Sequence, residues 1–140
     1  QYFSEDSEVE RSIIGEGTEI YGKVYNSVIG CNVVVGAGTV VRDSIIMNDT
    51  KIGHGGELNK VIIAENVTVG DRVKMGIGEE KDNETDPHIY NHGLCTVGEK
   101  SVIPNDVTIG KNVCIGGVTE QEDYPDLYLP SGRTMIKAGE

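Results

Sequence analysis

The chain has 140 residues, a length typical of one domain, and its 23 acidic against 12 basic residues give a formal charge of −11. This charge repels nucleic-acid backbones and anionic membranes, and no apolar run approaches the roughly 20 residues of a membrane span, so we expect neither partner. The absence of a signal-peptide pattern and the odd cysteine set, with spacings that match no zinc or redox motif, predict a cytoplasmic setting and free thiols at Cys31, Cys95 and Cys114.

The chain begins with Gln1 rather than methionine, which predicts a piece of a longer protein. A recurrence of aliphatic residues starts near the N-terminus. It runs through Val9, Ile14, Ile20, Val24 and Ile29, and one side near Gly22 is shortened by two residues. A regular recurrence of this kind is the mark of a repeat architecture and is sought before individual elements.

Three consecutive blocks of 17 residues then align without a gap: NSVIGCNVVVGAGTVVR, DSIIMNDTKIGHGGELN and KVIIAENVTVGDRVKMG. Large aliphatic residues return after 6, 6 and 5 positions, as at Ile46, Ile52 and Leu58. Two positions before each stands a small or β-branched residue, which in a strand points to the same side. Each half-dozen residues is therefore predicted to form one short strand and a corner, where Gly, Asn or Asp supplies the turn dihedrals.

Three such sides close one coil, and stacked coils pair like residues in parallel ladders. We therefore predict an all-β fold, a parallel β-helix of the hexapeptide-repeat type with three-sided coils of about 17–18 residues and one loop insertion. The single domain would cover 1–140, with coils at 7–76 and 94–116. The charged segment 77–93 breaks the pattern and is predicted to be a loop leaving a corner. Residues 117–140 are predicted to be a C-terminal cap or tail that packs on the last coil or crosses to a partner.

The stretches GTEIYGKVYNSVI, VGAGTVVRDSIIM and TVGEKSVIPNDVTIGKNV, with the opening Gln1-Tyr2, resemble the C-terminal β-helix domain of bacterial glucose-1-phosphate adenylyltransferases, also called ADP-glucose pyrophosphorylases. The resemblance covers roughly Gln1 to Ile115 and implies a left-handed helix. It also implies a structural, oligomerisation and regulatory domain. The parent enzyme of that family makes ADP-glucose and pyrophosphate from ATP and glucose 1-phosphate for glycogen synthesis.

The same resemblance implies that the domain binds its own N-terminal catalytic domain and forms homo-oligomers or hetero-oligomers. The parent would use ATP and Mg, but the glycine-rich nucleotide loop and the metal-binding aspartates of that catalytic domain are missing here, so we assign no catalytic, cofactor or metal residue to this chain. Regulators of the family act near the seam between the two domains. Lys111, Arg133 and Lys137 are therefore candidates for an anionic effector site.

Two other functions remain open at this point. A complete trimeric acyltransferase with a coenzyme A thioester would use His88 or His92 as the base that deprotonates the acceptor. A zinc site of His54, His88 and His92 is disfavoured, because two of the three lie in the segment without repeat register. Gly36-Ala37-Gly38 is interpreted as a corner rather than a phosphate loop, since no helix follows it.

Overall fold

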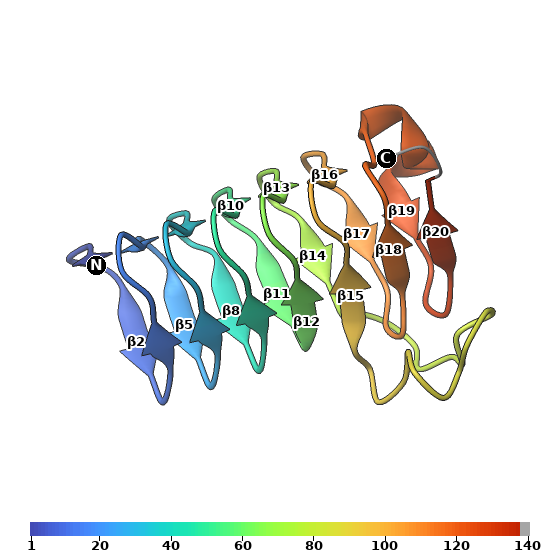
Figure 1. Ribbon diagram of the computed structural model, residues 1–140, viewed down its shortest axis with the longest axis horizontal. Coiled ribbons are helices and arrows are strands. Elements are labelled where there is room, and N and C mark those ends of the chain that lie inside the picture. Colours follow the sequence, from blue (N-terminus) through green and yellow to red (C-terminus); the bar gives the residue numbers. More distant parts are fainter. Residues whose placement is uncertain (138–140) are drawn as a thin grey trace.

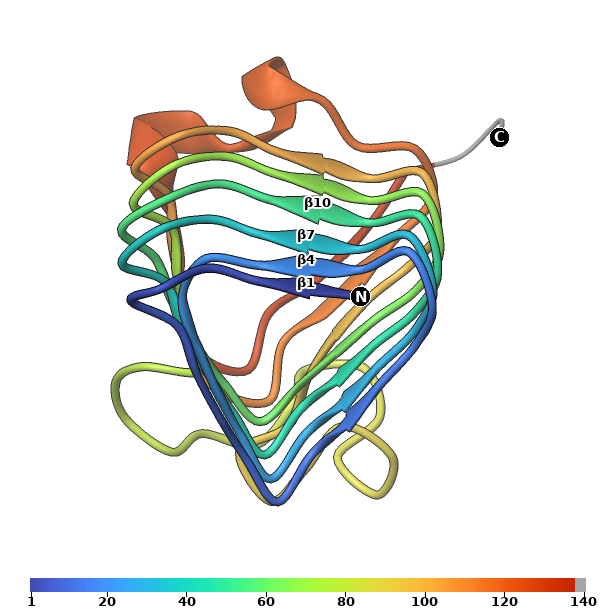
Figure 2. The ribbon, with the colours of Figure 1, turned by 90° about the vertical axis from the view of Figure 1, so that its left-hand side faces the viewer.

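The computed structural model describes residues 1–137, and over these the chain winds into a three-sided parallel β-helix (Figure 1). In Figure 2, which looks along the helix from its N-terminal end, the chain turns counterclockwise as it recedes, so the helix is left-handed. The predicted all-β fold of the hexapeptide-repeat type is confirmed. Within residues 1–137, no helix is long and apolar enough to cross a membrane.

The three sides of the coil are three parallel sheets, which we call faces A, B and C. Face A contains β1 (Tyr2–Phe3), β4 (Glu19–Ile20), β7 (Val34–Val35), β10 (Lys51–Ile52), β13 (Thr68–Val69) and β16 (Val102–Ile103). Face B contains β2 (Glu8–Glu10), β5 (Lys23–Tyr25), β8 (Val40–Arg42), β11 (Glu57–Asn59), β14 (Lys74–Met75), β17 (Thr108–Ile109) and β19 (Tyr128–Leu129). Face C contains β3 (Ile13–Ile14), β6 (Val28–Ile29), β9 (Ile45–Ile46), β12 (Val61–Ile63), β15 (Cys95–Val97), β18 (Cys114–Gly116) and β20 (Thr134–Ile136).

The core is a set of vertical columns of aliphatic side chains. On face C, Ile29 pairs with Ile46 and Ile46 with Ile63, and each is at most 1% exposed. Because every inward residue stacks on the same position of the next coil, the columns leave little space along the axis. Burying one such side chain contributes about 1.5–3 kcal/mol, and this repeated term drives the stacking.

Buried hydroxyls join successive coils at the corners. Ser44 donates its hydroxyl to the carbonyl of Arg42 at 2.7 Å and accepts the N–H of Val61, 17 residues later, at 3.1 Å. Thr50 does the same at another corner, with the carbonyl of Ala64 and the N–H of Val67. These serines and threonines satisfy backbone groups that the turn would otherwise leave buried without a partner.

The shortened side near Gly22 is confirmed. Ser12 and Ser27 lie 15 residues apart across the first coils, against the 17 that separate Ser27 from Ser44. A Cβ on Gly22 would lie 2.3 Å from the carbonyl oxygen of Thr39, so this tight corner accepts only glycine. A groove of about 520 Å³, lined by Tyr21 among others, lies beside it.

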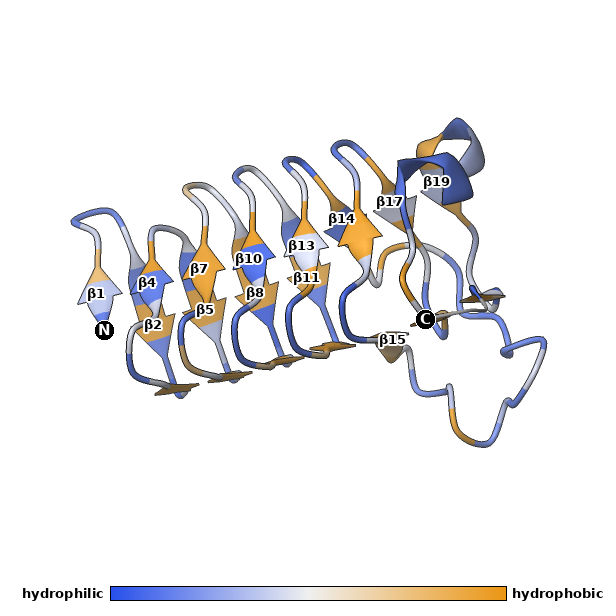
Figure 3. Cartoon of the chain, turned by 45° about the horizontal axis from the view of Figure 1, so that its top comes forward, coloured by the Kyte–Doolittle hydropathy of each residue, from blue (hydrophilic) through white to orange (hydrophobic). Residues whose placement is uncertain are grey.

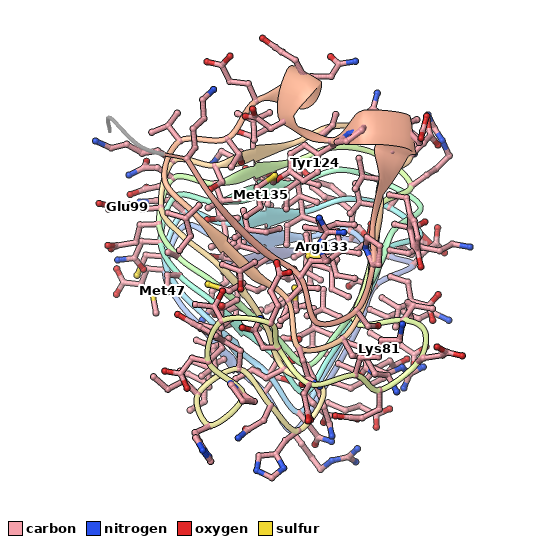
Figure 4. All side chains as sticks on the ribbon, turned by 90° about the vertical axis from the view of Figure 1, so that its right-hand side faces the viewer. Met47, Lys81, Glu99, Tyr124, Arg133 and Met135 are labelled. Carbon is pink, nitrogen blue, oxygen red and sulfur yellow. The ribbon has the colours of Figure 1, made fainter. Side chains whose placement is uncertain are left out.

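The helix extends beyond the predicted coils at both ends. Tyr2 pairs with Glu19, so the first coil begins at β1 rather than at residue 7. Beyond residue 116, the tail adds β19 and β20, and its side on face A is replaced by two short 3₁₀ helices, η1 (Gln121–Asp123) and η2 (Pro125–Leu127). Figure 4 shows Tyr124 and Met135 over the C-terminal end of the core. The tail is therefore both strand and cap. The last three residues of the range 117–140 lie outside the described part.

The insertion at 77–93 leaves the corner between faces B and C, where β14 would otherwise lead directly into the next strand of face C. It is as long as one coil, because Val61 pairs with Cys95, two coil lengths later in the sequence. Figure 3 colours it mostly as hydrophilic, in keeping with its sequence. It folds back along the last coils, and its Asn83 side chain is buried against them.

Candidate interaction face

The outer surface of face C carries a continuous row of aliphatic side chains. Ile13 pairs with Val28, Val28 with Ile45, and Ile45 with Ile62. Ile13 is 68%, Val28 44% and Ile45 41% exposed, and Ile62 is half-buried. Ladder spacing places these side chains about 4.8 Å apart, so they form one stripe rather than scattered contacts.

The other two faces carry charge at the matching outward position. On face B, Glu8 and Lys23 pair across neighbouring strands with 3.4 Å between carboxylate and ammonium, and Glu57 pairs with Lys74 in the ladder. On face A the same position holds residues such as Glu19 and Lys51 beside apolar ones. Face C is thus the one side whose outward row is aliphatic from β3 to β12.

Beside the stripe, at the corner between faces C and A, the surface projects little. A Cβ on Gly15 would lie 2.6 Å from the backbone of Gly30, so consecutive corners pack backbone against backbone there. Met47, 39% exposed, is the largest side chain on this flank of the first three coils. Large exposed apolar surfaces of this kind mark contact sites in soluble proteins. We call the stripe of Ile13, Val28, Ile45 and Ile62, together with Met47, the apolar face.

The insertion closes the apolar face at its C-terminal end. Cys114 occupies the outward row of face C and is only 6% exposed, and the hydroxyl of Tyr90 in the insertion lies against its thiol. The contact of the Tyr90 hydroxyl with the Cys114 thiol raises the pKa of Tyr90. Ile89, 61% exposed, stands next to Tyr90 at this boundary. The apolar face is therefore open along the first coils and ends at the insertion.

A family profile described as GlmU-like, C-terminal hexapeptide, matches residues 3–97. The chain belongs to this hexapeptide-repeat family. It is also 55% identical over 140 residues to a glucose-1-phosphate adenylyltransferase of Lachnospira eligens, 44% over 139 residues to one of Acetivibrio thermocellus, and 47% over 135 residues to one of Thermotoga maritima. These alignments cover 100%, 99% and 96% of the chain, so the resemblance drawn from the sequence is confirmed.

The relatives are much longer proteins. The chain spans about a third of their length, 33% of the first two and 32% of the third. In a domain of a longer protein, a surface that can contact the remainder of that protein is a candidate functional site, as a pocket is. The apolar face is a row of exposed aliphatic side chains that recurs in register over four successive strands of face C.

The acyltransferase hypothesis is not favoured by these comparisons, and the histidines do not gather. His54 lies on the corner between faces A and B, where its Nε2 is 3.3 Å from Asp71 Oδ2. His88 and His92 are exposed on the insertion, at the corner between faces B and C. Among residues 1–137, no three histidine, cysteine, aspartate or glutamate side chains are placed to hold a metal ion.

The three candidate effector cations do not form one cluster. Arg133, directly before β20, has its Nε 3.5 Å from Glu84 Oε2. Lys111 lies close by, since its carbonyl accepts the N–H of Gly132. Lys137 follows the far end of β20 and lies 3.3 Å from Asp123. That hydrogen bond raises the pKa of Lys137.

The sequence also contains a pattern that indicates the apolar face. On face C the residue before the inward aliphatic is itself aliphatic, in the pairs Ile13-Ile14, Val28-Ile29, Ile45-Ile46 and Ile62-Ile63. On face B that preceding residue is commonly charged, as in Lys74-Met75. A pair of adjacent aliphatic residues that recurs once per coil therefore identifies the face whose inward and outward surfaces are both apolar.

Proposed function

We propose that this chain is the β-helix domain of a glucose-1-phosphate adenylyltransferase, and that it serves as a structural and oligomerisation element beside a catalytic domain. The observation that carries the proposal is the similarity of 44–55% over essentially the whole chain to two proteins of that name. The parent would join ATP and glucose 1-phosphate to give ADP-glucose and pyrophosphate, with Mg, in the cytoplasm, for glycogen synthesis. The catalytic groups would lie in the part of the parent outside this chain.

The direct test is the activity of the full-length parent protein. Purified parent incubated with ATP, Mg²⁺ and glucose 1-phosphate should release pyrophosphate and form ADP-glucose, both measured by chromatography. Acetyl-coenzyme A with a panel of amino-sugar acceptors serves as the comparison, because it tests the acyltransferase alternative. Acyl transfer without nucleotidyl transfer would refute the proposal.

Within this proposal, the apolar face is the side that packs against the parent's catalytic domain. Three observations support this orientation: the aliphatic row, the close backbone packing at the corner beside it, and the charged residues of face B. The valines Val28 and Val34 provide a matched pair: both stand at the outward position of two-residue strands, Val28 on face C and Val34 on face A.

Val28→Glu should weaken domain association in the full-length parent, because it places a charge in an apolar contact, whereas Val34→Glu should not. Limited proteolysis of the parent measures the effect. Faster release of the β-helix fragment is expected for Val28→Glu at unchanged circular dichroism. Equal release from both variants would remove the apolar face from the proposal while leaving the nucleotidyltransferase assignment intact.

Regulation by an anionic effector belongs to the same proposal, through Lys111, Arg133 and Lys137. Lys111 and Arg133 lie at the same corner, which supports a shared role for these two more than for Lys137. Lys111→Ala should reduce activation of the parent by a sugar phosphate without changing its basal rate. Unchanged activation would exclude Lys111 from effector binding.

A further inference from the structure

The final coil makes fewer of the strand pairings that hold the other coils together. Its strands β19 and β20 each lie at the end of a sheet and pair with one neighbour only. Its third side is not a strand but the 3₁₀ helices η1 and η2, and its ladder to the preceding coil spans 20 residues instead of 17. A coil with one stacked neighbour and one irregular side is expected to open more readily than the interior coils.

The insertion supplies contacts to this coil that the repeat does not. Asn83, 3% exposed, donates from Nδ2 to the carbonyl of Asn112 at 2.9 Å and to that of Arg133 at 3.4 Å. Its Oδ1 accepts the hydroxyl of Thr134 at 3.1 Å. One buried amide of the insertion therefore contacts both of the last two coils, at positions 29 and 50 residues away in sequence.

A second buried amide belongs to the coil and makes the reciprocal contacts to the insertion. Asn112, 1% exposed, belongs to a coil corner and donates from Nδ2 to Glu80 Oε2 and to the carbonyl of Lys81, both at 2.8 Å. Its Oδ1 accepts the N–H of Gly93 at 2.8 Å. Because every polar atom of this amide is satisfied by the insertion, losing the insertion's geometry would leave a buried amide without partners.

The insertion also pairs with the backbone of the final coil. The N–H of Glu84 donates to the carbonyl of Gly132 at 2.7 Å, and Glu84 Oε2 accepts the N–H of Thr134 at 2.8 Å. A Cβ on Gly132 of the final coil would lie 2.5 Å from the carbonyl oxygen of Asp82 and 3.5 Å from the Cβ of Lys81, so the insertion packs closely against this coil. These contacts run along the edge where a further coil would otherwise stack.

We propose that residues 77–93 act as a clamp that holds the final coil closed on the stack. Asn83 and Asn112 are its two fastening points, and Tyr90 is the part of it that lies against Cys114. The clamp opens locally, without unfolding of the interior coils. Its opening uncovers the Cys114 thiol and releases the amides of β19 and β20 to exchange with solvent.

Thiol labelling of the intact chain, with each cysteine located by mass spectrometry, tests the clamp. Cys114 reports on the clamp, the fully buried Cys95 reports on the stack, and the half-buried Cys31 serves as an internal reference. Asn83→Asp keeps the acceptor that Thr85 and Asp86 use in a local turn, but removes the donors to the two coils. It should raise the labelling rate of Cys114 about tenfold or more and leave Cys95 unlabelled.

Asn112→Gly is the second variant, because glycine keeps the left-handed backbone at φ 57° while removing the amide. It should also raise Cys114 labelling about tenfold. Its matched control is Asn66→Gly, a corner asparagine at φ 59° far from the insertion, and His88→Ala controls for substitution within the insertion. In both control variants, Cys114 should be labelled at the same rate as in the unsubstituted chain.

Two results would overturn the clamp. Unchanged labelling of Cys114 in Asn83→Asp, the variant least disturbing to the local fold, would show that the buried amide does not hold the coil. Labelling of Cys95 in step with Cys114 would show that the whole stack opens rather than the final coil alone. Hydrogen exchange of peptides covering 126–137 supplies an independent measurement, with loss of protection confined to them expected.

Discussion

The neighbouring isoleucines Ile45 and Ile46 of β9 allow a direct test of which side of the sheet is core. Ile46 is 1% exposed and stacked between Ile29 and Ile63, so truncation to alanine removes buried methylenes and leaves a cavity that the columns above and below cannot fill. Such truncations cost about 2–5 kcal/mol. Ile45 is 41% exposed, and its truncation should cost at most about 1 kcal/mol.

Urea unfolding of the two variants, followed by circular dichroism, measures this difference. Stacked coils can open in segments, so hydrogen exchange of peptides from 40–65 should accompany it to show that the loss lies in the coils around β9. Equal losses of unfolding free energy in Ile45→Ala and Ile46→Ala would mean that both sides of face C are buried in the isolated chain. The distinction between core and apolar face would then fail.

Three further changes have defined outcomes. Ser44→Ala leaves the buried N–H of Val61 without its acceptor and should lower the free energy of unfolding by about 1–3 kcal/mol in urea titrations, with the same change at the less buried Ser12 costing less. Burial raises the pKa of Cys95 to about 12, so this thiol should resist alkylation at neutral and mildly alkaline pH until the chain unfolds in urea; early alkylation would contradict its place in the core. The backbone N–H of Glu120 and then Lys137 lower the pKa of Asp123 below its ordinary 3.8. Its contribution to stability is therefore present above that value and lost as the pH falls through the lower folded pKa, and Asp123→Asn should flatten this acid limb of a thermal melting profile.

The interior of the helix could be predicted from the sequence because its spacing is enforced at every coil. An inward residue is fixed by the residue one coil earlier, so the recurrence at 6, 6 and 5 positions maps onto the observed ladders such as Ile29, Ile46 and Ile63. The same recurrence continues one step further than predicted, to Phe3, which pairs with Ile20. An aromatic residue in an aliphatic column, 44% exposed at the open end of the stack, hid that step.

The docking of the insertion could not be predicted in this way. Asn83 is one asparagine among many polar residues, and its burial depends on partners 29 and 50 positions away that no period connects. The length of the insertion adds to the difficulty, because it equals one coil and the repeat resumes in phase after it. Contacts made by side-chain amides to backbone carbonyls depend on the tertiary arrangement, and local sequence carries little of that information.

The division between inward and outward positions explains how one repeat can hold a fold and a recognition surface together. The inward column tolerates only apolar residues of suitable volume, whereas the outward row is restrained only by ladder neighbours, so each face can acquire its own chemistry. In a chain with a net charge of −11, the outward rows of faces A and B include charged residues such as Lys51 and Glu57, while that of face C stays aliphatic from Ile13 to Ile62. A glutamate at Val28 should therefore alter association and leave the coil intact, while a glutamate at its neighbour Ile29 should unfold the stack, because there the charge would be buried without a partner.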